Sequence, residues 1–358
     1  FIPSFSNRSV CVIAMPIVCL LQRQQETGFS HPNKEAILKA MRQNTQAEAC
    51  WLIRKFIKGN KMRAIDYIRL LSLAAIWGAS FLFMRIASPA IGPINTAFFR
   101  VFFGLIGLAF IIVIIRKSLA FRGKLGKILI LGAINSGIPF LMYSIAAILL
   151  PAGYSAILNA TTPLTGAMIG FFIFSESLTI KKWLGVTLGI VGITIITTVG
   201  ESNIVGNIYI GVAACIIATI GYGFAGFLTR RWVTQKGGLD STLVAFGSQI
   251  GATIFLTPFL IWNLSSGPNI DWLQGDVWVS LLAVGFLCTS FAYILYFRLI
   301  ADIGPLRSLT VTFLVPPFAV LWGFLILDET ISSGFLLGSL VVLLSVWLIV
   351  STDPKKTT

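Results

Sequence analysis

Polar and aromatic side chains recur at helical spacing within long apolar stretches of this 358-residue sequence. Residues three or four positions apart lie on one helix face, so each group would present hydroxyl and amide groups to one space. Such a lining could bind a small molecule; alternatively, Asn and Thr only join neighbouring helices, typically for under about 1 kcal/mol each. The groups are Asn135, Pro139, Met142 and Tyr143; Ser155, Asn159, Thr162 and Gly166; and Ser308, Thr312 and Pro316.

Aromatic residues in other stretches could form the walls of the same cavity. Aromatic side chains in apolar helices also fill ordinary packing positions, so wall and packing are alternative interpretations for each of them. The candidates are Trp77, Ser80, Phe81 and Met84 on one helical face, with Tyr222 and Tyr293 in two later stretches.

Arg100 is the only charged residue clearly within one of these stretches. A charge at the centre of a bilayer costs about 2.5–3.5 kcal/mol on insertion scales. Arg100 is expected about one helical turn from the end of its stretch, so the default expectation is that its side chain extends to the membrane surface. The alternatives are that it binds a substrate carboxylate or holds a loop.

Pro139, Pro163 and Pro316 fall inside apolar stretches and are candidate helix hinges. Each removes a backbone hydrogen bond and crowds the preceding turn. The freed carbonyl groups could line a cavity or mark a hinge, and the alternative is a static kink held by tight packing.

Ten apolar stretches would have to position these side chains. Hydrophobic residues make up 56% of the chain and charged residues 11%, against roughly 25% charged residues in soluble domains, which excludes a soluble globular protein. The stretches are continuously apolar, so they predict an all-α integral membrane protein with ten transmembrane helices and not a barrel. We expect helices near residues 66–86, 95–115, 127–149, 153–174, 182–199, 207–229, 241–263, 277–299, 305–327 and 334–351.

Basic residues predict the orientation of these helices. The net charge is +14, but Lys and Arg gather in the short gaps between spans, unlike the basic face of a nucleic-acid-binding protein. They concentrate in every second gap, and only Arg85 falls in the opposite set. The positive-inside rule therefore predicts a multi-pass protein of the cell (inner) membrane with both termini in the cytoplasm.

Residues 1–61 differ from the rest, since they are polar and begin with Phe1. Their apolar segment 10–21 is about half the roughly 20 residues of a span, so a signal-peptide core, a weak amphipathic anchor and translated upstream sequence are the alternatives. We favour the last, because Met62 opens the segment leading into the first span. The expected domains are a disordered or non-native extension 1–61, a first repeat 62–200 and a second repeat 201–358.

The chain contains an internal repeat. With five helices in each half, the second half must enter the membrane from the opposite side, so Glu176 and Glu329 would lie at opposite faces. Inverted repeats are typical of carriers that open to either face in turn, and the alternative is a duplication kept for folding alone. A shift of 153 residues aligns, without gaps, Tyr143 with Tyr296, Ser155 with Ser308, Pro163 with Pro316, Gly170 with Gly323, Glu176 with Glu329 and Gly185 with Gly338.

These segments resemble the EamA family of the drug/metabolite transporter superfamily. The resemblance covers residues 66–351 and rests on segments 163–185 (PLTGAMIGFFIFSESLTIKKWLG), 316–338 (PPFAVLWGFLILDETISSGFLLG), 76–85 (IWGASFLFMR) and 98–104 (FFRVFFG). It implies a ten-helix carrier, often an exporter of amino acids or related metabolites, with helices one, three, four, six, eight and nine around a central cavity. The second half departs from the usual Trp-containing signature, although Tyr222 still answers to Trp77.

The prediction is a secondary transporter, a permease or exporter, of small metabolites such as amino acids or related amphipathic compounds. No Asp, Glu, His or Lys lies deep in the ten spans, so a proton relay has no candidate and facilitated transport or other coupling is favoured. We expect no catalytic residue, metal or other cofactor, because the spans hold no His and no Gly-rich phosphate loop. An intramembrane enzyme or a non-transporting membrane protein is the alternative.

The expected partners are a small-molecule substrate and the lipid bilayer, with no nucleic acid. Glu176 and Glu329 end their helices and are expected to be solvated structural residues. The GxxxG spacings at Gly185 and Gly189 and at Gly334 and Gly338 permit close helix approach. We expect them to pack within the chain, with a homodimer seam on the fifth and tenth helices as the alternative.

Overall fold

The computed structural model describes residues 63–199, 207–266, 270, 272–303, 308 and 310–351, so the predicted extension 1–61 lies outside the described residues. The described residues are helical and include no strand, which confirms the all-α fold class. The elements are α4 (Ala64–Ile91), α5 (Pro93–Ile114), α6 (Leu125–Gly132), η2 (Ala133–Gly137), α7 (Ile138–Leu149), α8 (Ala152–Asn159), α9 (Thr162–Phe172), α10 (Ile180–Thr198), α11 (Ile208–Trp232), η3 (Thr234–Lys236), α12 (Ser241–Ser265), α13 (Gly275–Leu282), η4 (Ala283–Phe291), α14 (Ala292–Ile303), α16 (Val311–Leu327) and α17 (Ser333–Val350).

Ten membrane spans are consistent with these elements. Eight helical stretches of the described chain are long and apolar enough to cross a membrane: α4, α5, α6 to α7, α10, α11, α12, α13 to α14 and α17. The other two predicted spans correspond to α16, with 17 residues, and to α8 followed by α9. Within the described residues, 64–228 and 240–351 belong to one compact unit. Segment 229–239, which contains the end of α11 and the 3-10 turn η3, does not belong to this unit.

The fourth span is interrupted, which corrects the expectation of one continuous helix over residues 153–174. α8 ends at Asn159 and α9 begins at Thr162. Pro163 has no N–H to donate to the Asn159 carbonyl, and its ring would clash with that carbonyl in an unbroken helix. The Thr162 hydroxyl donates to the same carbonyl at 2.7 Å. The acceptor freed by the proline is therefore satisfied within the break.

Two π-helical segments occupy equivalent positions in the two halves. A shift of 153 residues maps η2 onto residues 286–290, which lie inside η4. The same shift aligns Pro139, the second residue after η2, with Ala292, the first residue after η4. The wider turn therefore does not depend on a proline. π-helical turns are rare and occur often at functional sites, so their duplication points to a role shared by the two halves.

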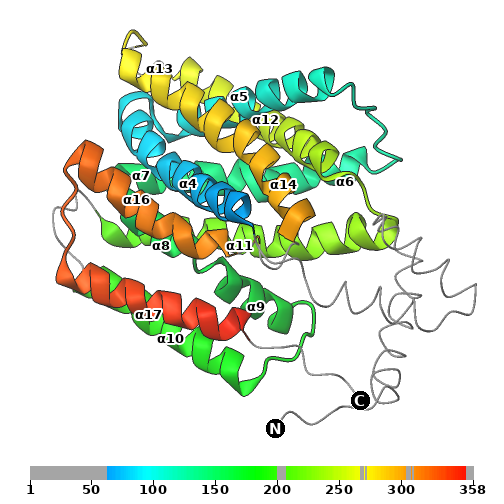
Figure 1. Cartoon of the computed structure of the whole chain (residues 1–358). Coiled ribbons are helices and arrows are strands. Elements are labelled where there is room, and N and C mark those ends of the chain that lie inside the picture. Colours follow the sequence, from blue (N-terminus) through cyan, green and yellow to red (C-terminus); the bar gives the residue numbers. More distant parts are fainter. Residues whose placement is uncertain are drawn as a thin grey trace, which may run out of the picture. The chain divides into compact units, whose positions relative to one another are not determined.

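Helix packing follows the same correspondence. α5 packs against α12, the second helices of the two halves, and α10 packs against α17, the fifth helices. α12 also contacts α6 and η2, while α5 contacts the corresponding elements α13 and η4. Figure 1 shows α10 beside α17 and α16 next to α4. These paired contacts support two related five-helix halves.

Glycines bring α10 and α17 together. A Cβ on Gly192 would lie 2.9 Å from the Val342 amide nitrogen and 3.0 Å from the Gly338 carbonyl oxygen, closer than a side chain can be accommodated without movement. The Ser345 hydroxyl donates to the Gly185 carbonyl at 2.7 Å across the same seam. The GxxxG spacings of the fifth and tenth helices thus serve packing within the chain, as expected.

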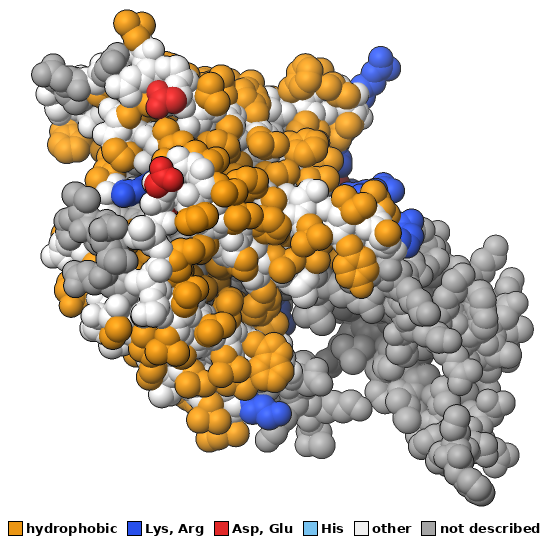
Figure 2. All heavy atoms as spheres, turned by 60° about the vertical axis from the view of Figure 1, so that its left-hand side comes forward, with side chains coloured by type: hydrophobic (Ala, Val, Ile, Leu, Met, Phe, Trp, Pro, Cys, Tyr) orange, Lys and Arg blue, Asp and Glu red, His pale blue; other side chains and the backbone are white. Residues whose placement is uncertain are grey.

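Large apolar side chains form much of the surface. Ile180, at the start of α10, is 76% exposed, and Leu340, in the middle of α17, is 66% exposed. Figure 2 shows one face on which hydrophobic side chains predominate, with few charged side chains among them. A contiguous apolar surface of this kind is unfavourable in water and suits contact with lipid.

Candidate functional site

Four sequence-predicted residues meet in a polar and aromatic cluster, here called the Tyr143 cluster: Phe81, Tyr143, Asn159 and Tyr222. The Tyr143 hydroxyl donates to Asn159 Oδ1 at 2.8 Å, which joins α7 to α8. The Phe81 ring meets the Tyr143 ring edge-on at 5.5 Å between centroids, and the Tyr222 ring lies 6.2 Å from it in a stacked orientation. Because Tyr222 belongs to α11, the cluster draws on both halves of the chain.

Arg100 lies buried beside this cluster, so the expectation that its side chain extends to the membrane surface is wrong. It is 7% exposed. Its guanidinium carbon lies 3.7 Å from the centroid of the Phe140 ring, and Nη1 donates to the Met84 sulphur at 3.0 Å. A desolvated cation over an aromatic face gains about 2 kcal/mol, roughly the cost of placing the charge in the membrane. The helix α5 lies against α7 and η4 here, so the side chain reaches protein and not lipid.

Three tyrosines lie near the Arg100 charge. Tyr143, Tyr222 and Tyr293 all lie within range of electrostatic interaction with the guanidinium. Tyr293 also stacks on Phe297, with centroids 5.6 Å apart. The arrangement combines one cation, several hydroxyl groups and flat apolar rings in one buried region. These groups have the chemistry to recognise a small molecule with one polar end and one apolar end.

The remaining candidates take more separate positions. The Trp77 ring lies 5.3 Å from that of Tyr296, while the Ser80 hydroxyl donates to the Trp77 carbonyl within α4 at 2.6 Å. The Thr162 hydroxyl donates to the Asn159 carbonyl at the break between α8 and α9. Asn135 is half-buried in η2 and Thr312 is half-buried in α16. Of the candidate hinges, Pro163 lies at the break, Pro139 follows η2, and Pro316 lies in the unbroken helix α16.

Gln249 is a buried polar residue that the sequence analysis missed. It is fully buried in α12, and its amide nitrogen donates to the Ser136 hydroxyl at 3.4 Å. Its Oε1 atom has no hydrogen-bond partner. A Cβ on Gly104, one helical turn beyond Arg100, would lie 3.5 Å from this oxygen. An amide in the middle of an apolar span was the available signal, since such a group must be satisfied inside the bundle.

An ion pair closes one end of α4 against the second half. Arg85 Nε lies 3.6 Å from Glu329 Oε1, and Arg85 Nη1 donates to the carbonyls of Ala147 and Ile148 at 2.6 and 2.8 Å. The Ala152 amide, at the start of α8, donates to both oxygens of Glu329 at 3.1 and 3.0 Å. We call this set of contacts the Glu329 latch. Glu329 is thus bonded and largely buried, and not the solvated residue that was expected.

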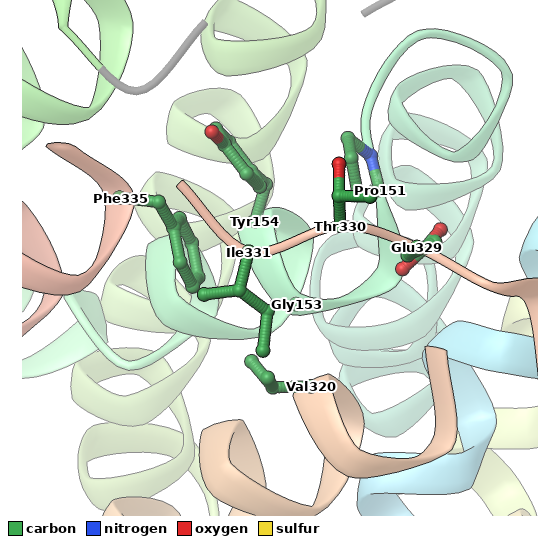
Figure 3. Close-up of a pocket in the computed structure, with 8 residues that line it drawn as sticks. All are labelled: Pro151, Gly153, Tyr154, Val320, Glu329, Thr330, Ile331 and Phe335. Atoms are coloured by element: carbon green, nitrogen blue, oxygen red, sulfur yellow. The ribbon is translucent and has the colours of Figure 1, made fainter. Parts of the chain in front are cut away.

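A small pocket adjoins the Glu329 latch. Figure 3 shows its lining, which includes Glu329, Thr330 and Ile331 of the loop between α16 and α17, and Tyr154 of α8. The Tyr154 ring stacks on Phe335 with centroids 4.3 Å apart. Burial raises the pKa of the Glu329 carboxyl, although the Ala152 hydrogen bond and the Arg85 charge oppose the rise. The latch therefore contains a carboxyl group that takes up a proton more readily than it would in water.

The other end of α4 is also attached to the second half. Arg69 Nη1 lies 2.6 Å from Asp302 Oδ2 in α14, and Arg298 Nε lies 3.2 Å from the same oxygen. Ion pairs therefore attach α4 to the second half near both of its ends.

The Glu176 turn repeats the backbone of the Glu329 turn: the Glu176 amide donates to the Gly170 carbonyl at 2.8 Å, and the Glu329 amide to the Gly323 carbonyl at 3.1 Å. The two turns therefore have the same backbone hydrogen bond in the two halves.

Comparison with known proteins supports the resemblance found in the sequence. The model of the EamA-like transporter family matches twice, over residues 65–198 and 209–351. The uncharacterized transporter YoaV of Bacillus subtilis is 24% identical over 281 residues, covering 78% of this chain and 94% of YoaV. Protein PecM of Dickeya dadantii is 25% identical over 264 residues, covering 74% of this chain and 84% of PecM. A chloroplastic WAT1-related protein of Arabidopsis thaliana is 26% identical over 311 residues, covering 82% of this chain and 71% of that protein.

The fold has also been observed in a crystal. One crystal structure superposes with a TM-score of 0.55 and covers 80% of this chain and 96% of that chain. Its sequence is 12% identical, so this likeness concerns the fold alone. With two family matches that together span most of the chain and with helices apolar enough to cross a bilayer, this protein is a multi-pass integral membrane protein of the EamA-like transporter family, within the drug/metabolite transporter superfamily.

Proposed function

We propose that this protein is a secondary transporter that exports small metabolites, namely amino acids or related amphipathic compounds, by alternating access between two inverted repeats. The observation that carries the proposal is the Tyr143 cluster, because its residues come from both halves and lie among helices whose packing is duplicated. In carriers built from inverted repeats, the substrate site lies where the repeats meet.

The Glu329 latch supports the alternating mechanism. It fastens α4 and α8 of the first half to the loop between α16 and α17 of the second half. Breaking these polar contacts would leave that end of α4 held to the second half only by its apolar packing against α13 and α16, while the ion pair of α4 with α14 at the other end persists. The Glu176 turn is the corresponding element of the first half, and on an inverted topology it lies at the opposite face.

Several finer features belong to the same proposal. We place the protein in the inner membrane with both termini in the cytoplasm, because basic residues occupy alternate gaps. The repeats are assigned to residues 62–200 and 201–358, and Asn135, Thr312 and Trp77 to the part of the lining that becomes accessible on opening. A homodimer remains a proposal for surfaces other than the seam between α10 and α17. An intramembrane enzyme is disfavoured, because the proposed site offers no nucleophile paired with a base.

An export assay tests the proposed function. The full chain is expressed in bacteria, and the potency of toxic amino acid analogues and dyes is measured against cells that carry an Asn159→Ala variant at the same membrane level. Wild-type cells are expected to tolerate at least one compound better and to lower its internal concentration. A purified protein that changes no metabolite gradient in cells or in proteoliposomes would overturn the proposal.

A further inference from the structure

Arg100 is a buried cation that has no anionic partner in the described part of the chain. Its Nε atom has no hydrogen-bond partner, and its contacts are the Met84 sulphur and the face of the Phe140 ring. A guanidinium carries five N–H donors in a planar fork, and a thioether is a weak acceptor. Most of the donor capacity of this buried side chain is therefore unused.

The surroundings of Arg100 match one end of a small amphipathic anion. Tyr143, Tyr222 and Tyr293 lie within electrostatic range of the charge, and the Tyr143 hydroxyl donates to Asn159. The rings of Phe81, Tyr143 and Tyr222 lie next to one another and provide apolar faces. A planar carboxylate is the group that the guanidinium fork binds best, through two parallel hydrogen bonds.

We propose that Arg100 binds the carboxylate of the transported compound, whose apolar remainder packs on the tyrosine rings. The inference rests on the proposed transport function and narrows its substrates to monocarboxylates, including apolar α-amino acids. A single carboxylate fits better than a phosphate ester, since a dianion would require a second buried cation and the described spans place only Arg100 at this cluster.

A purely structural role predicts a different behaviour of the empty protein. A structural arginine stabilises the fold through its ion pair or carbonyl contacts, and its loss leaves those partners unsatisfied. Here removal of the charge leaves behind only a thioether and a phenyl ring. The unliganded Arg100→Gln variant is therefore expected to be at least as stable as the wild type, as is typical of side chains kept for function at a cost to stability.

The test compares acids with their methyl esters on the purified full-length protein. Thermal unfolding is recorded with L-phenylalanine, L-leucine or their methyl esters, in a carboxylate-free sulfate buffer and in chloride buffer, and transport of the same compounds is measured in proteoliposomes. The acids are expected to raise the melting temperature and to be transported, and the esters to do neither. Arg100→Gln should abolish the shift and reduce transport by about tenfold or more, and Arg100→Lys should retain part of both because it keeps the charge without the fork. The matched control is Arg116→Gln, an exposed arginine just beyond the C-terminal end of α5.

The outcomes separate this proposal from the transport function. Equal transport of acids and esters by the wild type would overturn carboxylate recognition while leaving transport intact, and this comparison needs no variant. An unliganded Arg100→Gln protein that unfolds at a lower temperature yet still prefers acids would show a structural role. A melting-temperature rise with chloride that equals the rise with the acids would show non-selective anion binding. Absence of transport for every compound would overturn the proposed function together with this inference.

Discussion

Tyr143 shows how a single side chain joins the packing and the chemistry of this protein. Its ring is buried between Phe81 and Tyr222, while its hydroxyl reaches Asn159 on the next helix. The sequence analysis placed Tyr143 and Asn159 on separate inward faces from spacing alone. It could not predict that they bond to each other, because the bond depends on the relative rotation of α7 and α8.

Replacing Tyr143 by Phe removes the hydroxyl and leaves Asn159 Oδ1 without its donor. Because a buried hydrogen bond contributes about 1 kcal/mol, we expect initial export rates to fall by about fivefold with little change in the amount of protein in the membrane. Export is measured in cells with matched expression, and Tyr209→Phe, an exposed tyrosine on α11, is the control. An equal loss of folded protein and of rate would show that the pair serves packing alone.

Arg100 marks the limit of prediction at this scale. Its distance from the end of the span suggested that the side chain reaches the membrane surface. The structure instead directs it across the bundle to Phe140 and Met84. The sequence pattern gives the depth of a side chain in the membrane but not which side of the helix neighbouring helices cover. Coverage by neighbouring helices decides whether Arg100 is buried in the bundle or reaches the membrane surface.

At the scale of elements, hydropathy located the spans well and their irregularities poorly. The predicted helix over residues 182–199 corresponds to α10 and the one over 334–351 to α17, each within two residues at both ends. Hydropathy does not predict the break between α8 and α9, although Pro163 is a candidate hinge by its position. The two π-helical segments have no counterpart in apolar periodicity, since widening one turn does not alter composition.

The Glu329 latch predicts a dependence of transport on pH. Two groups face the carboxyl: Arg85 from α4 and the Ala152 amide from α8. Burial raises the pKa of Glu329 in this closed arrangement, and exposure on opening would return it towards its ordinary value of about 4.3. The closed arrangement has the higher pKa, so proton uptake stabilises it and ionisation favours opening. Export through the wild type should therefore slow as the pH falls through the raised pKa.

Glu329→Gln tests this directly, because glutamine keeps the acceptor for the Ala152 amide but cannot ionise. We expect the variant to transport more slowly than the wild type at neutral pH and to lose the acid-dependent decrease. Rates are measured in proteoliposomes over roughly pH 4.5 to 7.5. A variant that retains the wild-type pH profile would show that another group titrates.

The seam between α10 and α17 predicts a local intolerance to side chains. Gly192→Ala would place a methyl group against the backbone of Val342 and Gly338. Overpacking of this kind costs about 1–3 kcal/mol, which should appear as a lower melting temperature of the purified protein. Gly226→Ala in α11 is the control, because nothing lies within 4 Å of the added methyl group. Equal melting temperatures for both variants would mean that the seam can separate without cost.

At the scale of the whole molecule, the internal repeat of the sequence predicts more of the structure than any other sequence feature. Its shift of 153 residues also relates η2 to η4 and the Glu176 turn to the Glu329 turn, neither of which the spacing of residues could describe. The ion pairs Arg69–Asp302 and Arg85–Glu329 could not be predicted from the sequence, because they join residues far apart in the chain.

The proposed inverted arrangement predicts that equivalent loop positions lie on opposite sides of the membrane. Ser177 and Thr330 are related by the repeat, and both are exposed. Each is replaced by cysteine in a background in which the five natural cysteines have been removed. A membrane-impermeant maleimide added to intact cells should label Thr330→Cys and leave Ser177→Cys unlabelled until the membrane is opened. Labelling of both from the same side would contradict the inverted topology.

Alternating exposure of the Tyr143 cluster is the central claim, and accessibility of a cysteine at Asn159 tests it most directly. In the same cysteine-free background, Asn159→Cys is treated with an impermeant maleimide added either inside or outside sealed vesicles. The account predicts labelling from each side, slowed by a transported compound. At the side of the latch, Glu329→Gln should slow the reaction because it favours the closed arrangement, and Arg85→Gln should speed it because it removes the ion pair. Labelling from one side only, in every variant and condition, would contradict it.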